Sequence, residues 1–263
     1  MSDNEKRLTF LGHLDELRKR LTRSVIAVTI TTIISFIFAK PIFALLTFES
    51  PLTRPVFDML ANKFHLVPAP GVNLVFIEVT EMLGSYMRVS LVSGIILAIP
   101  YLTYELIMFV SPALTRKEKG YVYLALPWIA LMFAAGVIFG YFILLPPAIK
   151  FLLSFGSDIA TPQIRIGNYI SVVTRLLLAI GLVFETPVVI TFLARLGVVT
   201  SQWLAGKRKV AVIVAFVVAG IITPTFDPVN QSLVAIPLII LYEMSIWLAR
   251  LVQKKAPRPA VSL

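Results

Sequence analysis

The chain has 263 residues, of which 58% are hydrophobic and only 14% are charged. Soluble globular proteins usually carry about 25% charged residues, so this composition indicates an integral membrane protein. The absence of cysteine excludes disulfides, thiolate metal sites and cysteine nucleophiles. A net charge of +10 could indicate nucleic-acid binding, but the basic residues gather between hydrophobic segments, which argues against it.

The N-terminal segment, residues 1–23, is charged and amphipathic. Four leucines form a stripe that is typical of a short helix lying along the membrane surface. They are Leu11, Leu14, Leu17 and Leu21. On the polar side, Glu16 lies four residues before Arg20, a spacing that predicts a helical ion pair. Asp15 and Lys19 have the same spacing.

Six hydrophobic runs predict six transmembrane helices, because a helix satisfies its own backbone hydrogen bonds in lipid. The runs are residues 24–39, 83–110, 121–145, 170–196, 210–222 and 233–251. The fifth run rises only about 20 Å, against a hydrocarbon core of about 30 Å. Because Pro237 interrupts the sixth run, we expect short fifth and sixth helices that leave a concave groove. The prediction is an all-α polytopic membrane protein with a single domain, residues 1–263.

The loops set the expected orientation. Most of the 24 basic residues lie in the N-terminal segment, the loops after the second and fourth runs, and the tail, residues 252–263. By the positive-inside rule both termini are then cytoplasmic. The long outer loop, residues 40–79, contains five prolines, and we expect it to form a cap with little regular structure.

An enzyme is not expected. The two histidines, His13 and His65, show no zinc-protease spacing, and the sequence has no glycine-rich phosphate loop and no GxSxG nucleophile turn. Ser93 has no histidine partner within any hydrophobic run. We therefore predict neither catalytic residues nor a cofactor or metal.

Ionisable residues within the hydrophobic runs are candidate functional groups, because a charge at mid-bilayer costs a few kcal/mol or more. They are Arg88, Glu105, Arg175, Glu185 and Glu243. Glu185 lies ten residues, about 15 Å, deeper than Arg175 and hence near the midplane. For Arg88 and Arg175, snorkelling to the outer interface is the simpler interpretation. Glu243 is open between a structural and a functional role.

Glu185 has two interpretations. A neutral, protonated carboxyl is expected in lipid, because burial disfavours the charged form, and it would bond to polar groups on adjacent helices. In a functional role it contacts a partner. In a structural role it only holds in place a helix that Pro187 kinks.

Several stretches together resemble the twin-arginine translocase subunit TatC family. They are FLGHLDELRKRL (10–21), FVSPALTRKEK (109–119), GLVFETP (181–187), ITPTFDPVNQ (222–231) and AIPLIILYE (235–243). Six helices with both termini inside is also that family's fold. One departure is Glu105, which stands where the family tends to have a neutral amide. It would either add an acidic group near the cytoplasmic end of the second helix or pair with a partner group that is peculiar to this lineage.

The resemblance implies recognition of the paired arginines in signal peptides of folded export substrates, at a cytoplasmic site formed by Glu16, Arg18, Phe109 and Glu118. Paired guanidinium groups favour carboxylates, in agreement with this. For Glu118, a helix-capping role within Thr115–Glu118 is the structural alternative.

The resemblance also implies a proton-motive-force-driven complex with single-span TatA/TatB-type subunits in the bacterial or archaeal inner membrane, and a homo-oligomer within it. Glu185, Gln231 and Glu243 would contact partner helices in the groove. The alternative function is a proton-coupled small-molecule carrier that uses Glu185, although the internal repeats usual in such carriers are not evident.

Overall fold

The structure is a computed structural model that describes residues 10–48, 50–51, 53–64, 74–110, 116–155, 159, 163–195, 197–223 and 227–253. The chain forms two compact units, each built from separated stretches of sequence. The first comprises Met1–Val56, Gly71–Ala130 and Gln163–Thr174, and the second comprises Phe57–Pro70, Leu131–Pro162 and Arg175–Leu263. The single domain that the sequence predicts remains a prediction.

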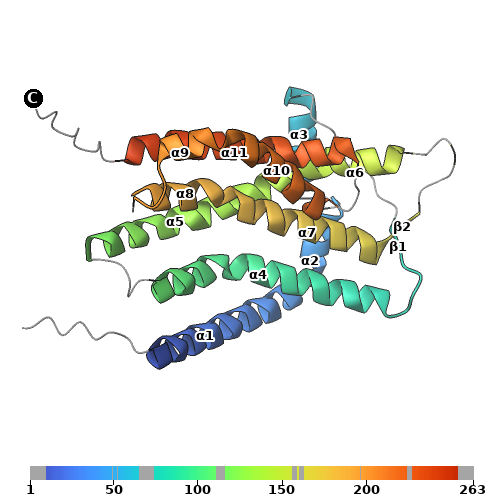
Figure 1. The fold of residues 1–263 in the computed structure, drawn as a ribbon. Helices are drawn as coiled ribbons and strands as arrows, with labels where there is room; N and C mark the ends of the chain where they lie inside the picture. The colour runs from blue at the N-terminus through green and yellow to red at the C-terminus, as the bar shows by residue number, and fades with distance from the viewer. Residues whose placement is uncertain are drawn as a thin grey trace, which may run out of the picture. The chain divides into compact units, whose positions relative to one another are not determined.

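Helices dominate the described residues (Figure 1). They are α1 (Phe10–Ile37), α2 (Ala39–Leu46), α3 (Arg54–Phe64), α4 (Glu81–Val110), α5 (Arg116–Phe139), α6 (Leu145–Ser154), α7 (Ile166–Phe184), α8 (Thr186–Arg195), α9 (Ser201–Gly206), α10 (Arg208–Ile222) and α11 (Pro228–Val252). A π-helical turn, η2 (Gly140–Leu144), joins α5 to α6. Two short strands, β1 (Leu74–Val75) and β2 (Ile164–Arg165), pair in parallel.

Five of the described helical segments are long and apolar enough to cross a membrane. They are Leu14–Ile37, Glu81–Leu106, Leu126–Ser154, Ile166–Arg195 and Pro228–Val252. The fifth hydrophobic run forms α10, which has 15 residues and a length of about 22 Å, as its short sequence predicts. The protein is thus a multi-pass membrane protein with an all-α fold.

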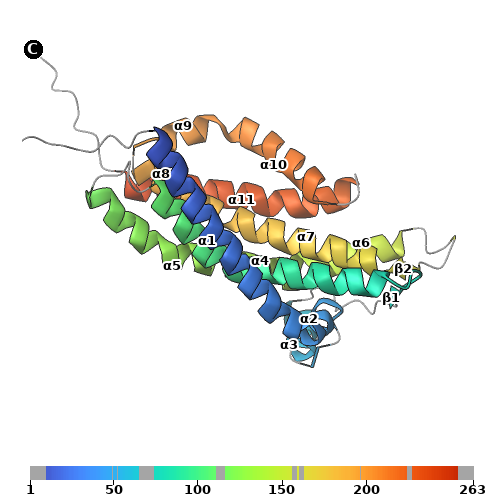
Figure 2. The ribbon, with the colours of Figure 1, turned by 90° about the horizontal axis from the view of Figure 1, so that it is seen from below.

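The sixth hydrophobic run differs from expectation, because α11 is not short. It continues through Pro237 for 25 residues, about 37 Å. Neighbouring helices can re-satisfy the backbone groups that a proline frees inside a membrane helix. In the second unit α11 packs against α8, α9 and α10 (Figure 2), and this packing holds the helix together across the proline.

Two other sequence expectations are corrected. The amphipathic N-terminal stretch does not form a separate surface helix, because α1 runs without a break from Phe10 to Ile37. The outer loop contains α2 and α3, although little regular structure was expected there. Pro55 stands at the second position of α3, in the first turn, where proline needs no backbone partner and favours helix initiation.

In the first unit, α1 packs closely against α4. The contact centres on Gly94, whose missing Cβ leaves room for the backbone of Thr32. The hydroxyl of Thr31 donates to the carbonyl oxygen of Gly94 at 2.8 Å. Small residues permit such close approach between membrane helices. This contact positions the polar side chains of α1 beside those of α4.

Candidate functional site

A polar cluster joins α1 to α4 in the first unit. Arg20 donates from Nη2 and Nε to Glu16 Oε1, at 2.6 and 3.0 Å. Its Nη1 donates to Glu105 Oε2 at 3.1 Å. Tyr101 donates its hydroxyl hydrogen to the other oxygen of Glu105 at 2.7 Å. One guanidinium group is therefore shared between two carboxylates from different helices.

Two side chains of this cluster are largely buried, so their pairing affects the stability of the fold. Glu105 is only 3% exposed, and the Arg20 side chain is 17% exposed. A buried carboxylate without a partner would cost several kcal/mol, so Arg20 and Tyr101 keep Glu105 stable in this position. The helical pair of Glu16 with Arg20 is confirmed, and so is the exposed pair of Asp15 with Lys19, at 2.7 Å. The third member, Glu105, was missed as a partner of Arg20.

The remaining residues of the expected signal-peptide site are placed less completely. Arg18 is exposed on α1. It lies two residues from Glu16 and therefore on a different face of the helix. Phe109 is half-buried near the end of α4. The start of α5 at Arg116 agrees with the predicted capping box, but Thr115 and the side chain of Glu118 lie outside the described residues.

A second polar cluster, which no sequence pattern predicts, lies at the start of α4. Glu81 accepts hydrogen bonds from the backbone of Ile77 at 3.0 Å and of Gly167 at 3.1 Å, and from Arg165 at 3.2 Å. Arg165 also donates to Glu78 at 2.9 Å. These hydrogen bonds, with that to Glu81 the strongest, raise the pKa of the Arg165 guanidinium above its usual value. Pairing across 84 residues leaves no local sequence signal.

This second cluster fixes local structure. Within the described residues, no three histidine, aspartate or glutamate side chains gather closely enough to hold a metal ion. The cluster ties the start of α7 to the start of α4. The paired strands precede these helices, β2 directly before α7 and β1 five residues before α4.

Arg88 also links α4 to α7 and does not extend unpaired to the membrane–water interface. It donates to the carbonyl oxygen of Gly167 at 3.3 Å and to the hydroxyl of Ser171. The snorkelling interpretation therefore misses its partners on α7. Arg175 is exposed, as that interpretation expects.

In the second unit, Glu185 occupies the break between α7 and α8. Pro187 lacks an N–H and so interrupts the helical hydrogen-bond ladder there, as the sequence predicts. Glu185 is half-buried, and within the described part of the chain its Oε1 is buried with no hydrogen-bond partner. The expected hydrogen bond from this oxygen to a neighbouring helix is thus not formed in the described structure.

Gln231 and Glu243 both connect α11 to α10. Gln231 donates from Nε2 to the carbonyl oxygen of Phe216 at 2.8 Å, beside Gly220. Glu243 forms two hydrogen bonds with Arg208, at 2.6 and 3.0 Å. Both residues therefore have structural partners within the hairpin.

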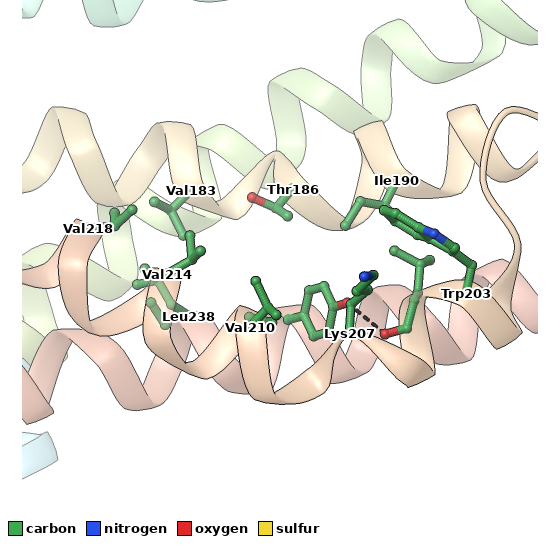
Figure 3. Close-up of a pocket in the computed structure, with 13 residues that line it drawn as sticks. Val183, Thr186, Ile190, Trp203, Lys207, Val210, Val214, Val218 and Leu238 are labelled. Atoms are coloured by element: carbon green, nitrogen blue, oxygen red, sulfur yellow. Dashed lines mark hydrogen bonds between the residues drawn. The ribbon is translucent and has the colours of Figure 1, made fainter.

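The second unit also contains an open cavity of about 570 Å³ between the end of α7 and helices α8, α9, α10 and α11 (Figure 3). Its lining is almost entirely apolar and comprises Val183, Thr186, Ile190, Trp203, Leu204, Lys207, Val210, Ala211, Val214, Ala215, Val218, Leu238 and Tyr242. Glu185, Gln231 and Glu243 are not among the described residues that line it.

Residues 12–237 match the family described as Sec-independent protein translocase protein (TatC). The chain belongs to the TatC family. This is a family of translocase proteins, not of enzymes. The match covers most of the chain and includes all four residues of the α1–α4 polar cluster, Glu16, Arg20, Tyr101 and Glu105.

Relatives in the TatC family extend the match over nearly the whole chain. A Sec-independent protein translocase protein TatC from Desulforapulum autotrophicum is 41% identical, covering 97% of this chain and 89% of its own. A Sec-independent protein translocase protein TatC from Carboxydothermus hydrogenoformans is 38% identical, covering 95% of this chain and 96% of its own. A crystal structure of the twin arginine translocase receptor TatC has a TM-score of 0.73 and 39% identity, covering 91% of this chain and 99% of that chain.

Proposed function

We propose that this chain is the subunit of a twin-arginine protein translocase that recognises the paired arginines of signal peptides on folded proteins. The observation that best supports this is the guanidinium group of Arg20 held between Glu16 and Glu105. The polar end of α1 and α4 already binds a guanidinium group with two carboxylates. An arginine of a signal peptide presents the same chemical group.

Recognition would then be an exchange of guanidinium groups. An incoming arginine takes Glu16, which is the more exposed of the two carboxylates, while Arg20 stays with the buried Glu105. Glu118 supplies the carboxylate for the second arginine, and Phe109 supplies apolar contact. Arg18 is exposed and available to polar groups of the peptide. Because Arg20 keeps one partner throughout, no buried carboxylate is left unpaired.

We further propose the setting in which this exchange operates. The protein lies in a bacterial or archaeal cytoplasmic membrane with both termini in the cytoplasm, as the distribution of basic residues favours. Single-span TatA/TatB-type subunits contact it at Glu185, Gln231 and Glu243. The resulting complex contains several copies of this chain and is driven by the proton motive force. The unsatisfied Oε1 of Glu185 supports a role for this group in accepting a partner.

Photocrosslinking of a twin-arginine signal peptide to the chain in native membranes tests the site. The variants are Glu16→Ala, Glu118→Gln and the double variant, because each removes a carboxylate that would face a peptide arginine. We expect each single variant to weaken crosslinking several-fold and the double variant to abolish it. Asp15→Asn removes a charge one position away on the exposed pair with Lys19, and it should crosslink as strongly as the parent.

Undiminished crosslinking in the double variant would overturn the site assignment. An equal loss in Asp15→Asn would show that only the net charge of the surface matters.

A further inference from the structure

The cavity of the second unit has an apolar body and one basic end (Figure 3). Lys207 and Trp203 lie at one end, whereas Val218 and Val183 lie at the other. Lys207 and Val218 are eleven residues apart along α10, so the cavity extends about 16 Å along the helix. This length matches one leaflet of a hydrocarbon core that is about 30 Å thick.

The Lys207 charge at the basic end has no acidic partner within the described part of the chain. Lys207, Arg208 and Lys209 are consecutive cations, but only Arg208 is neutralised there, by Glu243. The ammonium group of Lys207 lies 6.0 Å from the ring centre of Trp203. The hydroxyl of Tyr242 is already engaged with the carbonyl oxygen of Leu204 at 2.8 Å. Among the described lining residues, Lys207 therefore supplies the charged group that remains available to a ligand.

We propose that this cavity binds one acyl chain of an anionic phospholipid, whose phosphate group lies at Lys207. Tryptophan residues favour the membrane–water interface, so Trp203 marks the depth at which a headgroup lies. From that depth a lipid tail follows α10 toward Val218 and replaces water in the apolar cavity. The site is distinct from the polar cluster of α1 and α4, and the proposal does not depend on signal-peptide recognition.

A phospholipid fits better than a partner helix. The volume of about 570 Å³ is that of a small-ligand pocket, whereas a helix has a diameter of about 10–12 Å with its side chains. A partner helix also need not carry an anionic group at the position of Lys207. The lipid bilayer supplies both an acyl chain and a phosphate at the required separation.

Fluorescence quenching tests the proposal directly, because Trp203 lines the cavity. The chain has three tryptophans, so Trp128→Phe and Trp247→Phe leave Trp203 as the sole emitter. The protein is reconstituted in phosphatidylcholine vesicles that contain phosphatidylglycerol or phosphatidylcholine with brominated acyl chains. We expect brominated phosphatidylglycerol to quench at about fivefold lower mole fraction, since one lysine near an anionic surface contributes about 1 kcal/mol.

Matched variants separate the site from the surrounding surface. Lys207→Gln should remove the preference for phosphatidylglycerol, whereas Lys209→Gln, which removes a neighbouring cation outside the cavity, should retain it. Ala211→Phe fills the middle of the cavity and should weaken quenching by either brominated lipid. Circular dichroism and elution as a single species confirm that this variant is folded.

Three results would overturn the proposal. The first is equal quenching by the two brominated lipids in the parent. The second is an equal loss of preference in Lys207→Gln and Lys209→Gln, which would indicate general surface charge. The third concerns a synthetic single-span helix added to the vesicles. If it relieves the quenching of Trp203 in the parent but not in Ala211→Phe, the cavity holds a protein helix.

Discussion

At the level of single residues, Glu105 has the surroundings that matter most for the proposed site. It is almost fully buried, and it accepts hydrogen bonds from both Arg20 and Tyr101. A neutral amide at this position could not hold the Arg20 guanidinium by charge. In this chain Glu105 therefore shares the Arg20 guanidinium group with Glu16. Arg20 then binds Glu16 less tightly, and Glu16 stays available to an arginine of the peptide.

Glu105→Gln should weaken binding of a twin-arginine peptide. Without the charge of Glu105, Arg20 is held mainly by Glu16 and competes more strongly with the incoming arginine. Replacing a charge-assisted hydrogen bond by a neutral one costs about 0.5–1.5 kcal/mol, which corresponds to a roughly two- to tenfold weaker peptide affinity. Competition binding with a labelled signal peptide in detergent measures this. Stronger binding in Glu105→Gln would contradict the exchange, and Asp15→Asn is the charge-matched control.

Glu185 gives a different residue-level prediction. Because its Oε1 is buried without a partner in the described structure, Glu185→Leu should stabilise the isolated chain by about 1–3 kcal/mol. The same change should reduce co-purification of single-span subunits and leave peptide crosslinking intact. Thermal unfolding in detergent and affinity purification measure the two effects. A less stable variant that still recruits the subunits would show a purely structural role for Glu185.

At the level of secondary structure elements, the packing of α1 on α4 depends on Gly94. A Cβ at this position would lie 2.5 Å from Thr32 Oγ1 and 2.6 Å from Thr32 Cα. The Cα atom belongs to the backbone, so it cannot move away without shifting α1. Gly94→Ala should therefore destabilise the chain by about 1–3 kcal/mol and weaken the Thr31 hydrogen bond.

The control for this prediction is on the same helix. Gly84→Ala adds the same methyl group where nothing lies within 4 Å. Since alanine favours a helix over glycine by about 1 kcal/mol, this variant should be neutral or slightly more stable. Melting temperatures of both variants in one detergent decide the question. Equal destabilisation by the two substitutions would show that the α1–α4 contact is not tight.

Elements were predictable from the sequence where local chemistry decides them. Hydrophobic length gave the positions of α4 and α10, and Pro187 marked the break before α8. The ion pair of Glu16 with Arg20 follows from helical spacing alone. Glu105 could not be assigned to Arg20, because 85 residues separate them and only packing brings them together. The same reason hides the contacts of Arg165.

Prolines caused the main errors at this level. Proline in the first turn of α3 favours a helix, although prolines in the outer loop suggested irregular structure. Pro237 does not end α11, which packs against α8, α9 and α10, and neighbouring helices can compensate for a backbone hydrogen bond lost at proline. Whether proline breaks or permits a helix depends on its position in the turn and on its neighbours, and the sequence shows only the first of these.

At the level of the whole molecule, the charge distribution predicts cytoplasmic termini. The chain has no cysteine, so single-cysteine variants report accessibility without interference. We expect a membrane-impermeant maleimide to label Ser154→Cys in intact spheroplasts and Lys209→Cys only after the membrane is opened. Both positions are exposed in the structure. The opposite labelling pattern would show that the chain inserts with inverted orientation.

Recognition of paired arginines is the central claim, and crosslinking of matched signal peptides tests it most directly. Two peptides that differ only in carrying Arg-Arg or Lys-Lys are given the same photoreactive group and offered to membranes containing the chain. Because guanidinium groups bind carboxylates through two parallel hydrogen bonds and ammonium groups do not, the Arg-Arg peptide should crosslink at least tenfold more strongly. Equal crosslinking of both peptides would contradict the claim.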